Sequence, residues 1–177
     1  MQRSEHHLAV RRSAVRCIVV VIALFAAFAL LPFRGDNWWI GALVGAALLA
    51  TTVPLAVNRL HKVLASDRPG FEAAEALIQL VAMLITGFAA VLYAMNRDGT
   101  QVAGLATRVD AVYFTVTTLS TVGYGDIHAI SQAARVVVTV QILFDLMFLG
   151  VLVRVFIGAA RKRVNERGET VLGSTLE

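Results

Sequence analysis

Long apolar runs separated by short polar segments dominate the chain. Three of them cover residues 38–57, 71–95 and 131–160, and a shorter one covers residues 17–33. About 20 apolar residues in a helix cross the hydrocarbon core of a bilayer, and about 17 is the lower end of the range. The pattern predicts four transmembrane helices. Between the last two, residues 111–119 form an apolar piece that is far too short to cross.

The run at 17–33 has a second interpretation, a cleaved signal peptide. Basic residues precede it, and Ala27–Ala29 offers a small-residue cleavage site. The apolar run continues past that site to Phe33, which favours a helix that is retained.

Several residues signal where helices begin, end or pack. Asp67 is placed to cap the third helix and Ser131 the fourth. Pro54 is expected to kink or end the second helix. Gly41 and Gly45 are four residues apart on that helix, a spacing that lets a neighbouring helix approach closely.

Composition and charge favour a membrane protein with a defined direction. Hydrophobic residues make up 58% of the chain, above the 45–50% of soluble domains. The net charge of +4 is unevenly distributed. With both termini in the cytoplasm, eleven basic residues lie inside and three outside, as the positive-inside rule requires. The inside set is Arg3, Arg11, Arg12, Arg16, Arg59, Lys62, Arg68, Arg161, Lys162, Arg163 and Arg167, and the outside set is Arg34, Arg97 and Arg108.

The short apolar piece has the features of a re-entrant helix followed by a loop. Thr107 and Asp110 have capping-box spacing, which predicts a helix over residues 110–120. The sequence Ser-Thr-Val-Gly-Tyr-Gly-Asp follows at residues 120–126. Gly123 and Gly125 adopt positive φ at little steric cost, so successive carbonyl groups in this loop can point the same way.

This heptapeptide resembles the selectivity-filter signature of potassium channels at every position. Residues 71–160 resemble the outer helix, pore helix, filter and inner helix of bacterial two-transmembrane potassium channels. The resemblance implies an all-α membrane protein that forms a homotetrameric pore, because one loop per chain requires four chains. It implies that K⁺ binds to carbonyl oxygens of Thr121, Val122, Gly123 and Tyr124 and to the Thr121 hydroxyl, with Gly125 completing the filter.

The resulting layout has four parts. Residues 1–16 are a cytoplasmic N-terminal segment, 17–60 hold two extra helices, 71–160 are the pore domain, and 161–177 are a basic cytoplasmic tail. Neither extra helix has an arginine at every third position, so no voltage sensor is expected. The interpretation is a multi-pass channel of the plasma membrane whose partners are lipids, K⁺ and its own copies. No cofactor, enzymatic site or nucleic-acid partner is expected.

Two positions next to the filter depart from the family pattern. Relatives often carry a pore-helix glutamate that pairs with the filter aspartate, and Thr117 stands in its place. Asp126 therefore needs another partner, and Tyr113, where relatives have a tryptophan, is predicted to contact it. A filter held less firmly leaves a weakly selective cation channel as an alternative, and a non-conducting membrane scaffold as another.

Asp145 lies in the middle of the fourth apolar run. A charge there costs about 2.5–3.5 kcal/mol on insertion scales. We expect a ring of four carboxylates in a central cavity, able to bind internal Mg²⁺ or polyamines and to cause inward rectification. The alternative is a structural aspartate bonded to Gln141, Thr117 or Thr118.

Two further residues carry predictions. His128 lies at the outer mouth, where a side chain that changes charge between pH 5 and 8 can confer sensitivity to external pH; an exposed, uninvolved histidine is the alternative. Arg154 is predicted to pair with Glu75 or Glu72, with snorkelling of all three to the head groups as the alternative.

Overall fold

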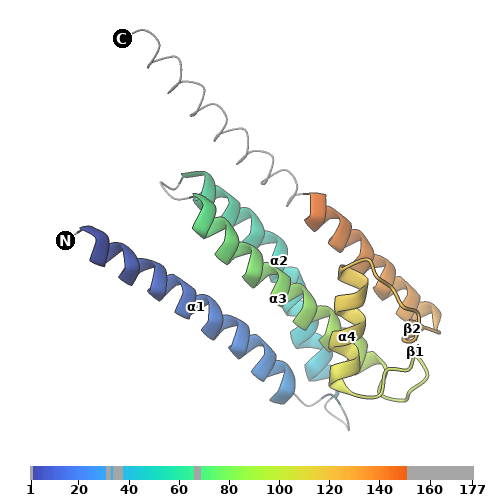
Figure 1. Ribbon diagram of the computed structural model, residues 1–177. Coiled ribbons are helices and arrows are strands. Elements are labelled where there is room, and N and C mark those ends of the chain that lie inside the picture. Colours follow the sequence, from blue (N-terminus) through green and yellow to red (C-terminus); the bar gives the residue numbers. More distant parts are fainter. Residues whose placement is uncertain (1, 31–32, 34–37, 66–68, 151–177) are drawn as a thin grey trace. The chain divides into compact units, whose positions relative to one another are not determined.

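The computed structural model describes residues 2–30, 33, 38–65 and 69–150, which are almost entirely helical (Figure 1). Two antiparallel two-residue strands pair Val102 with Ala129 and Ala103 with His128. A helix without a label runs from Gln132 to Gly150. The chain forms two compact units, Met1–Thr139 and Val140–Glu177, whose boundary lies within this helix. The labelled elements are α1 (Gln2–Leu30), α2 (Trp38–Ala65), α3 (Pro69–Met95), β1 (Val102–Ala103), α4 (Arg108–Leu119) and β2 (His128–Ala129).

Three of the described helices are long and apolar enough to cross a membrane: Trp39–Arg59, Ala73–Met95 and Gln132–Gly150. They correspond to three of the four predicted spans. The predicted span at 17–33 corresponds to the shorter apolar part of α1, Val15–Leu30. The expectation that Pro54 could end the second helix is wrong, because α2 continues through Pro54 to Ala65.

The interface between α2 and α3 depends on glycines at the contact (Figure 1). A Cβ atom on Gly45 would lie 2.9 Å from the Ala90 Cβ and 2.9 Å from the Gly87 carbonyl oxygen. A Cβ atom on Gly87 would lie 2.8 Å from the side chain of Leu49. The predicted role of Gly45 in close packing is therefore confirmed, and α3 is its partner. Such approach increases van der Waals contact, which drives helix association in lipid.

The hydrophobic core lies at one end of the helices, where the connection of residues 96–107 and α4 are found. We call this end of the helices the loop end. Aromatic rings form its centre: Phe33 packs against Phe28 and Tyr93 with ring centroids 5.2 and 5.4 Å apart. Buried residues of α3, α4 and the loops surround them, namely Ala89, Ala90, Leu92, Ala94, Val102, Leu105, Ala111, Phe114, Ile127 and Ala134. The core therefore joins α1, α3 and α4 near the segment 120–126.

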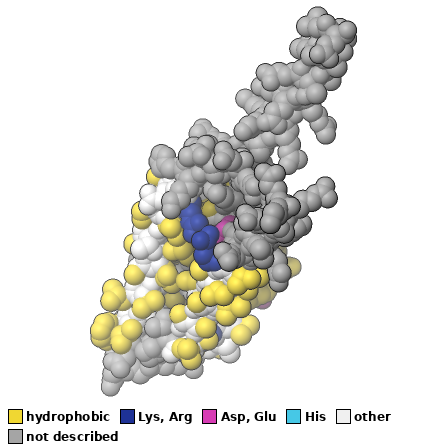
Figure 2. All heavy atoms as spheres, turned by 90° about the vertical axis from the view of Figure 1, so that its left-hand side faces the viewer, with side chains coloured by type: hydrophobic (Ala, Val, Ile, Leu, Met, Phe, Trp, Pro, Cys, Tyr) yellow, Lys and Arg dark blue, Asp and Glu magenta, His cyan; other side chains and the backbone are white. Residues whose placement is uncertain are grey.

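Towards the other end of α3, polar side chains connect three helices. Arg16 of α1 forms an ion pair with Glu75 of α3 at 3.2 Å, and Arg59 of α2 donates to the Gln79 Oε1 at 2.8 Å. Gln79 in turn lies 3.4 Å from the Glu75 carboxylate. In Figure 2 a compact basic patch lies beside an acidic side chain on a face that is otherwise mostly hydrophobic. Of the ion pair only Glu75 is buried, and a buried carboxylate of this kind requires such a partner.

The pairing predicted for Arg154 falls on a residue outside the described part of the chain, as does the side chain of Glu72. Glu75 has a partner that sequence reasoning did not identify, Arg16, which is 59 residues away. The predicted cap Asp67 also lies outside the described residues. At the other predicted cap, the Ala134 amide donates to the Ser131 hydroxyl at 3.0 Å, as an N-cap does.

Replacing Gly45 with alanine should weaken the packing of α2 on α3. The new methyl group would overlap Ala90 and the Gly87 carbonyl, and overpacking of this kind costs about 1–3 kcal/mol. We expect a lower midpoint of thermal unfolding for the purified protein in detergent. Gly150→Ala is the matched control, because a Cβ atom there meets nothing within 4 Å. Equal midpoints for the two variants would contradict the close approach.

Candidate functional site

A capping box begins α4. The Asp110 amide donates to the Thr107 hydroxyl at 3.2 Å, and the Asp110 carboxylate accepts from the Thr107 amide at 2.7 Å. The predicted pair is therefore confirmed, although the helix begins at Arg108, two residues earlier than expected. The backbone hydrogen bond from Thr107 lowers the pKa of Asp110. The cap thus stays charged at neutral pH and remains an acceptor.

The end of α4 holds the start of the segment Thr121–Asp126, which we call the candidate filter. Ser120 is the C-cap, and the Thr121 amide donates to the Thr118 carbonyl oxygen at 2.9 Å. The amides of Val122 and Gly123 both donate to the Thr117 carbonyl oxygen, at 3.0 and 3.2 Å. The bond from the Thr121 amide to Thr118 and the bond from the Val122 amide to Thr117 together form a Schellman motif. This motif normally has glycine at the position that Thr121 occupies.

Backbone angles alternate along the candidate filter. Thr121, Gly123 and Gly125 have positive φ values of 59°, 54° and 82°, whereas Val122 and Tyr124 between them do not. The two glycines agree with the expectation. Thr121 was not anticipated, because a β-branched residue at positive φ is strained and rare. All residues of the candidate filter are exposed in the single chain, whereas Ile127 directly after it is buried.

Tyr113 of α4 contacts the candidate filter twice. Its hydroxyl donates to the Asp126 Oδ2 at 2.9 Å, which confirms the predicted contact. Its ring is stacked on that of Tyr124 at 6.5 Å between centroids and 2° between planes. The hydrogen bond to Asp126 raises the pKa of the Tyr113 phenol, so the phenol remains protonated and able to donate.

Thr117 supports the candidate filter in a way that sequence reasoning missed. Its hydroxyl donates to the Phe114 carbonyl oxygen of its own helix at 3.0 Å. Its contribution to the candidate filter is the backbone carbonyl that accepts from Val122 and Gly123. A carbonyl group is common to all residue types, so no sequence signal marks this role.

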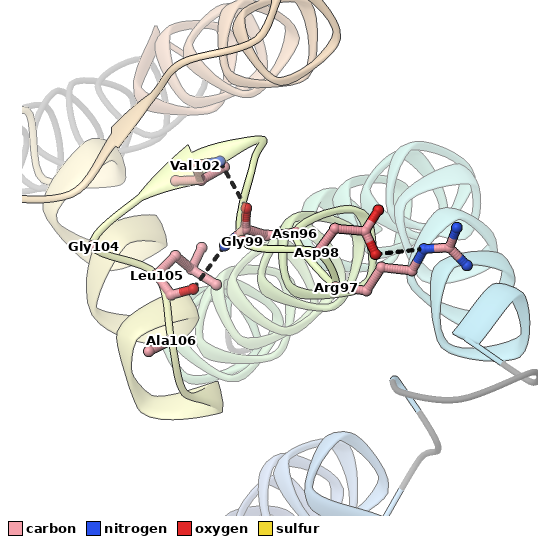
Figure 3. Close-up of a pocket in the computed structure, with 8 residues that line it drawn as sticks. All are labelled: Asn96, Arg97, Asp98, Gly99, Val102, Gly104, Leu105 and Ala106. Carbon is pink, nitrogen blue, oxygen red and sulfur yellow. Dashed lines mark hydrogen bonds and ion pairs between the residues drawn. The ribbon is translucent and has the colours of Figure 1, made fainter.

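The loop before α4, whose residues around Asn96 are drawn in Figure 3, contacts the other end of the candidate filter through Gly104. Asn96 is buried, and its Oδ1 accepts from the amides of Gln101 and Val102 at 3.0 and 2.8 Å while its Nδ2 donates to the Leu105 carbonyl oxygen at 2.7 Å. These bonds shape a hollow of about 600 Å³ beside the loop. Gly104 in the same loop lies so close to Asp126 that a Cβ atom would be 2.8 Å from its carbonyl oxygen. Sequence reasoning identified neither residue.

His128 lies on β2, two residues after the end of the candidate filter. Its Nδ1 is 3.1 Å from the Gly125 carbonyl oxygen, the last carbonyl of the Thr-Val-Gly-Tyr-Gly sequence. The side chain of His128 is exposed, as the alternative of an uninvolved histidine expects. Sensitivity to external pH stays a prediction.

Asp145 lies in the second compact unit and is buried, as is Gln141 one turn earlier. A side-chain hydrogen bond joins the two residues, as the structural alternative expects. The Asp145 Oδ2 is buried and has no hydrogen-bond partner within the described part of the chain. A buried carboxylate oxygen left in this state is costly.

Known proteins similar to this chain are channels. Residues 80–162 match a protein family described as "Ion channel". Two-pore potassium channel 5 of Arabidopsis thaliana is 35% identical over 80 residues, which are 44% of this chain and 19% of the relative. Potassium channel AKT2/3 of Arabidopsis thaliana is 47% identical over 38 residues, 22% of this chain and 5% of the relative. The chain thus matches less than a fifth of either relative's length.

No solved structure shows a significant match. The match to the ion-channel family over residues 80–162 and the apolar helices together support a membrane-embedded, multi-pass protein. Both relatives match in part, so the activity of the whole protein is a matter for proposal.

Tyr113→Phe should loosen the candidate filter, whereas Thr117→Val should not. The first change removes the hydrogen bond to Asp126 and keeps the ring stack. The second removes a hydroxyl bonded to Phe114 and keeps the supporting carbonyl. We expect severalfold faster amide hydrogen exchange at residues 122–127 in Tyr113→Phe alone. Equal exchange in the two variants would contradict these separate roles.

Proposed function

We propose that the chain is a subunit of a homotetrameric potassium-selective channel that conducts K⁺ passively across the plasma membrane. The observation that carries the proposal is the alternation of positive and non-positive φ from Thr121 to Gly125. This alternation is what aligned carbonyl groups require. It lies within the part of the chain that matches the ion-channel family, and the two similar plant proteins are potassium channels.

In this proposal the backbone replaces the water around the ion. Carbonyl oxygens of Thr121, Val122, Gly123 and Tyr124 from four chains would form stacked rings, and the Thr121 hydroxyl would add the innermost ring. Gly125 ends the filter. The carbonyl end of α4 carries partial negative charge, so four such ends would stabilise a cation in the middle of the membrane.

A tetramer would also account for exposed side chains next to the candidate filter. In the single chain the ring of Tyr124 is stacked on that of Tyr113. Val122 remains 52% and Tyr124 71% exposed. A neighbouring subunit would cover them, and cyclic symmetry would supply the same cover to each chain.

The charge distribution sets the proposed direction in the membrane. With both termini in the cytoplasm, the basic residues lie mainly inside and the loop end faces outward. The apolar part of α1, Val15–Leu30, would then be a fourth, short membrane helix. In this proposal α1 is retained rather than cleaved, and the burial of Phe28 in the core supports it.

Gly123→Ala should abolish K⁺ flux into liposomes that contain the purified protein. Alanine at positive φ costs about 1–2 kcal/mol, and the change would occur four times around one pore. Gly99→Ala is the matched control, because Gly99 also has positive φ and open space but lies in the loop after α3. Wild-type tetramers without any flux would exclude conduction and leave the non-conducting scaffold.

The weakly selective cation channel is the second candidate, since the side chain of Thr117 is bonded within its own helix and does not reach Asp126. Reversal potentials of the same liposomes under opposed K⁺ and Na⁺ gradients separate the two. A potential near the K⁺ equilibrium value supports selectivity, and one near zero supports the alternative.

We further propose that Asp145 contributes to a ring of four carboxylates that binds internal Mg²⁺ or polyamines. Its Oδ2 has no described partner, and such a cation would supply one. We expect spermine on the cytoplasmic side to reduce outward current in the wild type and much less in Asp145→Asn. Asp98→Asn is the control, because Asp98 is exposed and paired with Arg97. Unchanged block in Asp145→Asn would leave a purely structural role.

A further inference from the structure

Arg108 occupies an unfavourable position for a positive charge. It is the first residue of α4, directly after the N-cap Thr107. The first turn of a helix carries partial positive charge from its unpaired amide groups, so a cation there is destabilising. An arginine in this position therefore requires compensation from elsewhere.

The end of α1 supplies that compensation. The last carbonyl groups of a helix have no partner within it, and α1 has no basic residue in its last turn. The Arg108 Nη1 donates to the Phe28 carbonyl oxygen, in this last turn, at 3.0 Å. Arg108 thus caps α1 from a position 80 residues away, and its charge meets the negative end of the α1 dipole.

The connection between α1 and α2 adds a second contact. The Arg108 guanidinium carbon lies 5.2 Å from the centroid of the Phe33 ring, within the range of a cation–π interaction. Phe33 is 1% exposed and packs against Phe28 and Tyr93. Its ring also covers Gly41 of α2, where any side chain would overlap it. Arg108 therefore contacts α1 and a residue that is packed on α2.

The opposite end of α4 leads directly into the candidate filter. The Thr117 carbonyl near this end holds the amides of Val122 and Gly123. A short helix fixed at its first residue and bonded to the filter at its last turn transmits a change in position from one end to the other. Contacts therefore run without a break from Phe28 of α1 through Arg108 and α4 to Gly123 of the candidate filter.

We propose that Arg108 is a positioning residue through which the first two helices hold α4, and with it the filter, in the conducting geometry. This inference rests on the proposed channel function. In this inference α1 and α2, which have no counterpart in two-transmembrane channels, form a brace that holds α4 in position. The brace acts on ion selectivity and not on assembly alone.

Three variants test the proposal in liposomes. Arg108→Gln should lower the K⁺ over Na⁺ permeability ratio about tenfold, the size of one charge-assisted hydrogen bond. Arg108→Lys should recover part of the ratio, because lysine keeps the charge and a donor but lacks the planar guanidinium. Arg97→Gln removes a charge from an exposed residue paired with Asp98 at the same end of the helices and should leave the ratio unchanged.

The outcomes separate this proposal from the channel function. A wild type that conducts, with intact Arg108→Gln tetramers and an unchanged ratio, would overturn the brace and leave the channel. If Arg108→Gln does not assemble, Arg108→Lys decides: a reduced ratio supports the brace, and a wild-type ratio overturns it.

A wild type without flux would refute the channel function and with it the role of Arg108 in selectivity. Amide hydrogen exchange then tests the contact between Arg108 and α1 itself. Faster exchange at residues 108–112 in Arg108→Gln, with no change in Arg97→Gln, supports a brace that holds α4. No change in either variant overturns it.

Discussion

A segment of irregular backbone within an apolar bundle must find hydrogen-bond partners in the protein, and the rest of the structure depends on how this is done. The candidate filter has no helix or sheet ladder of its own. Its first amides are bonded to the Thr117 carbonyl at the end of α4. Its last residue accepts from Tyr113, and the loop built on Asn96 lies against it through Gly104. These contacts come from both sides and leave the face between them exposed.

Two kinds of contact hold the helices that carry this segment. The close approach of Gly45 to α3 adds many weak contacts and depends on the absence of a side chain. The ion pair of the exposed Arg16 with the buried Glu75 is a single polar contact, and its loss would remove one partner from a buried carboxylate. The first kind gives tight packing, and the second fixes which residues face each other. Near the loop end, the hydrogen bond from Arg108 to the Phe28 carbonyl oxygen is a single polar contact that plays the same part for α4.

The sequence was sufficient where a residue type has a conformational or solvation consequence of its own. Apolar length predicted the spans in α2 and α3, and spacing predicted the capping box of Thr107. The contact of Tyr113 followed from the resemblance to potassium channels. By contrast, nothing predicted the positive φ of Thr121, because a threonine has no preference for it and the hydrogen bonds at the end of α4 impose it. No sequence pattern indicated the contact of Arg108 with α1 either, since its acceptor is a backbone carbonyl.

Contacts to backbone atoms have a consequence for how substitutions act on this site. The Phe28 carbonyl remains after any substitution of its side chain, so the hydrogen bond depends on residue 108 and on the position of α1. The same holds for Thr117, whose carbonyl supports Val122 whatever its side chain. Side-chain changes at the acceptors should therefore be tolerated unless they alter packing, as they would at Phe28, which is buried and packs against Phe33. The geometry of the candidate filter is thus determined less by its own side chains than by where α1 and α4 place their ends.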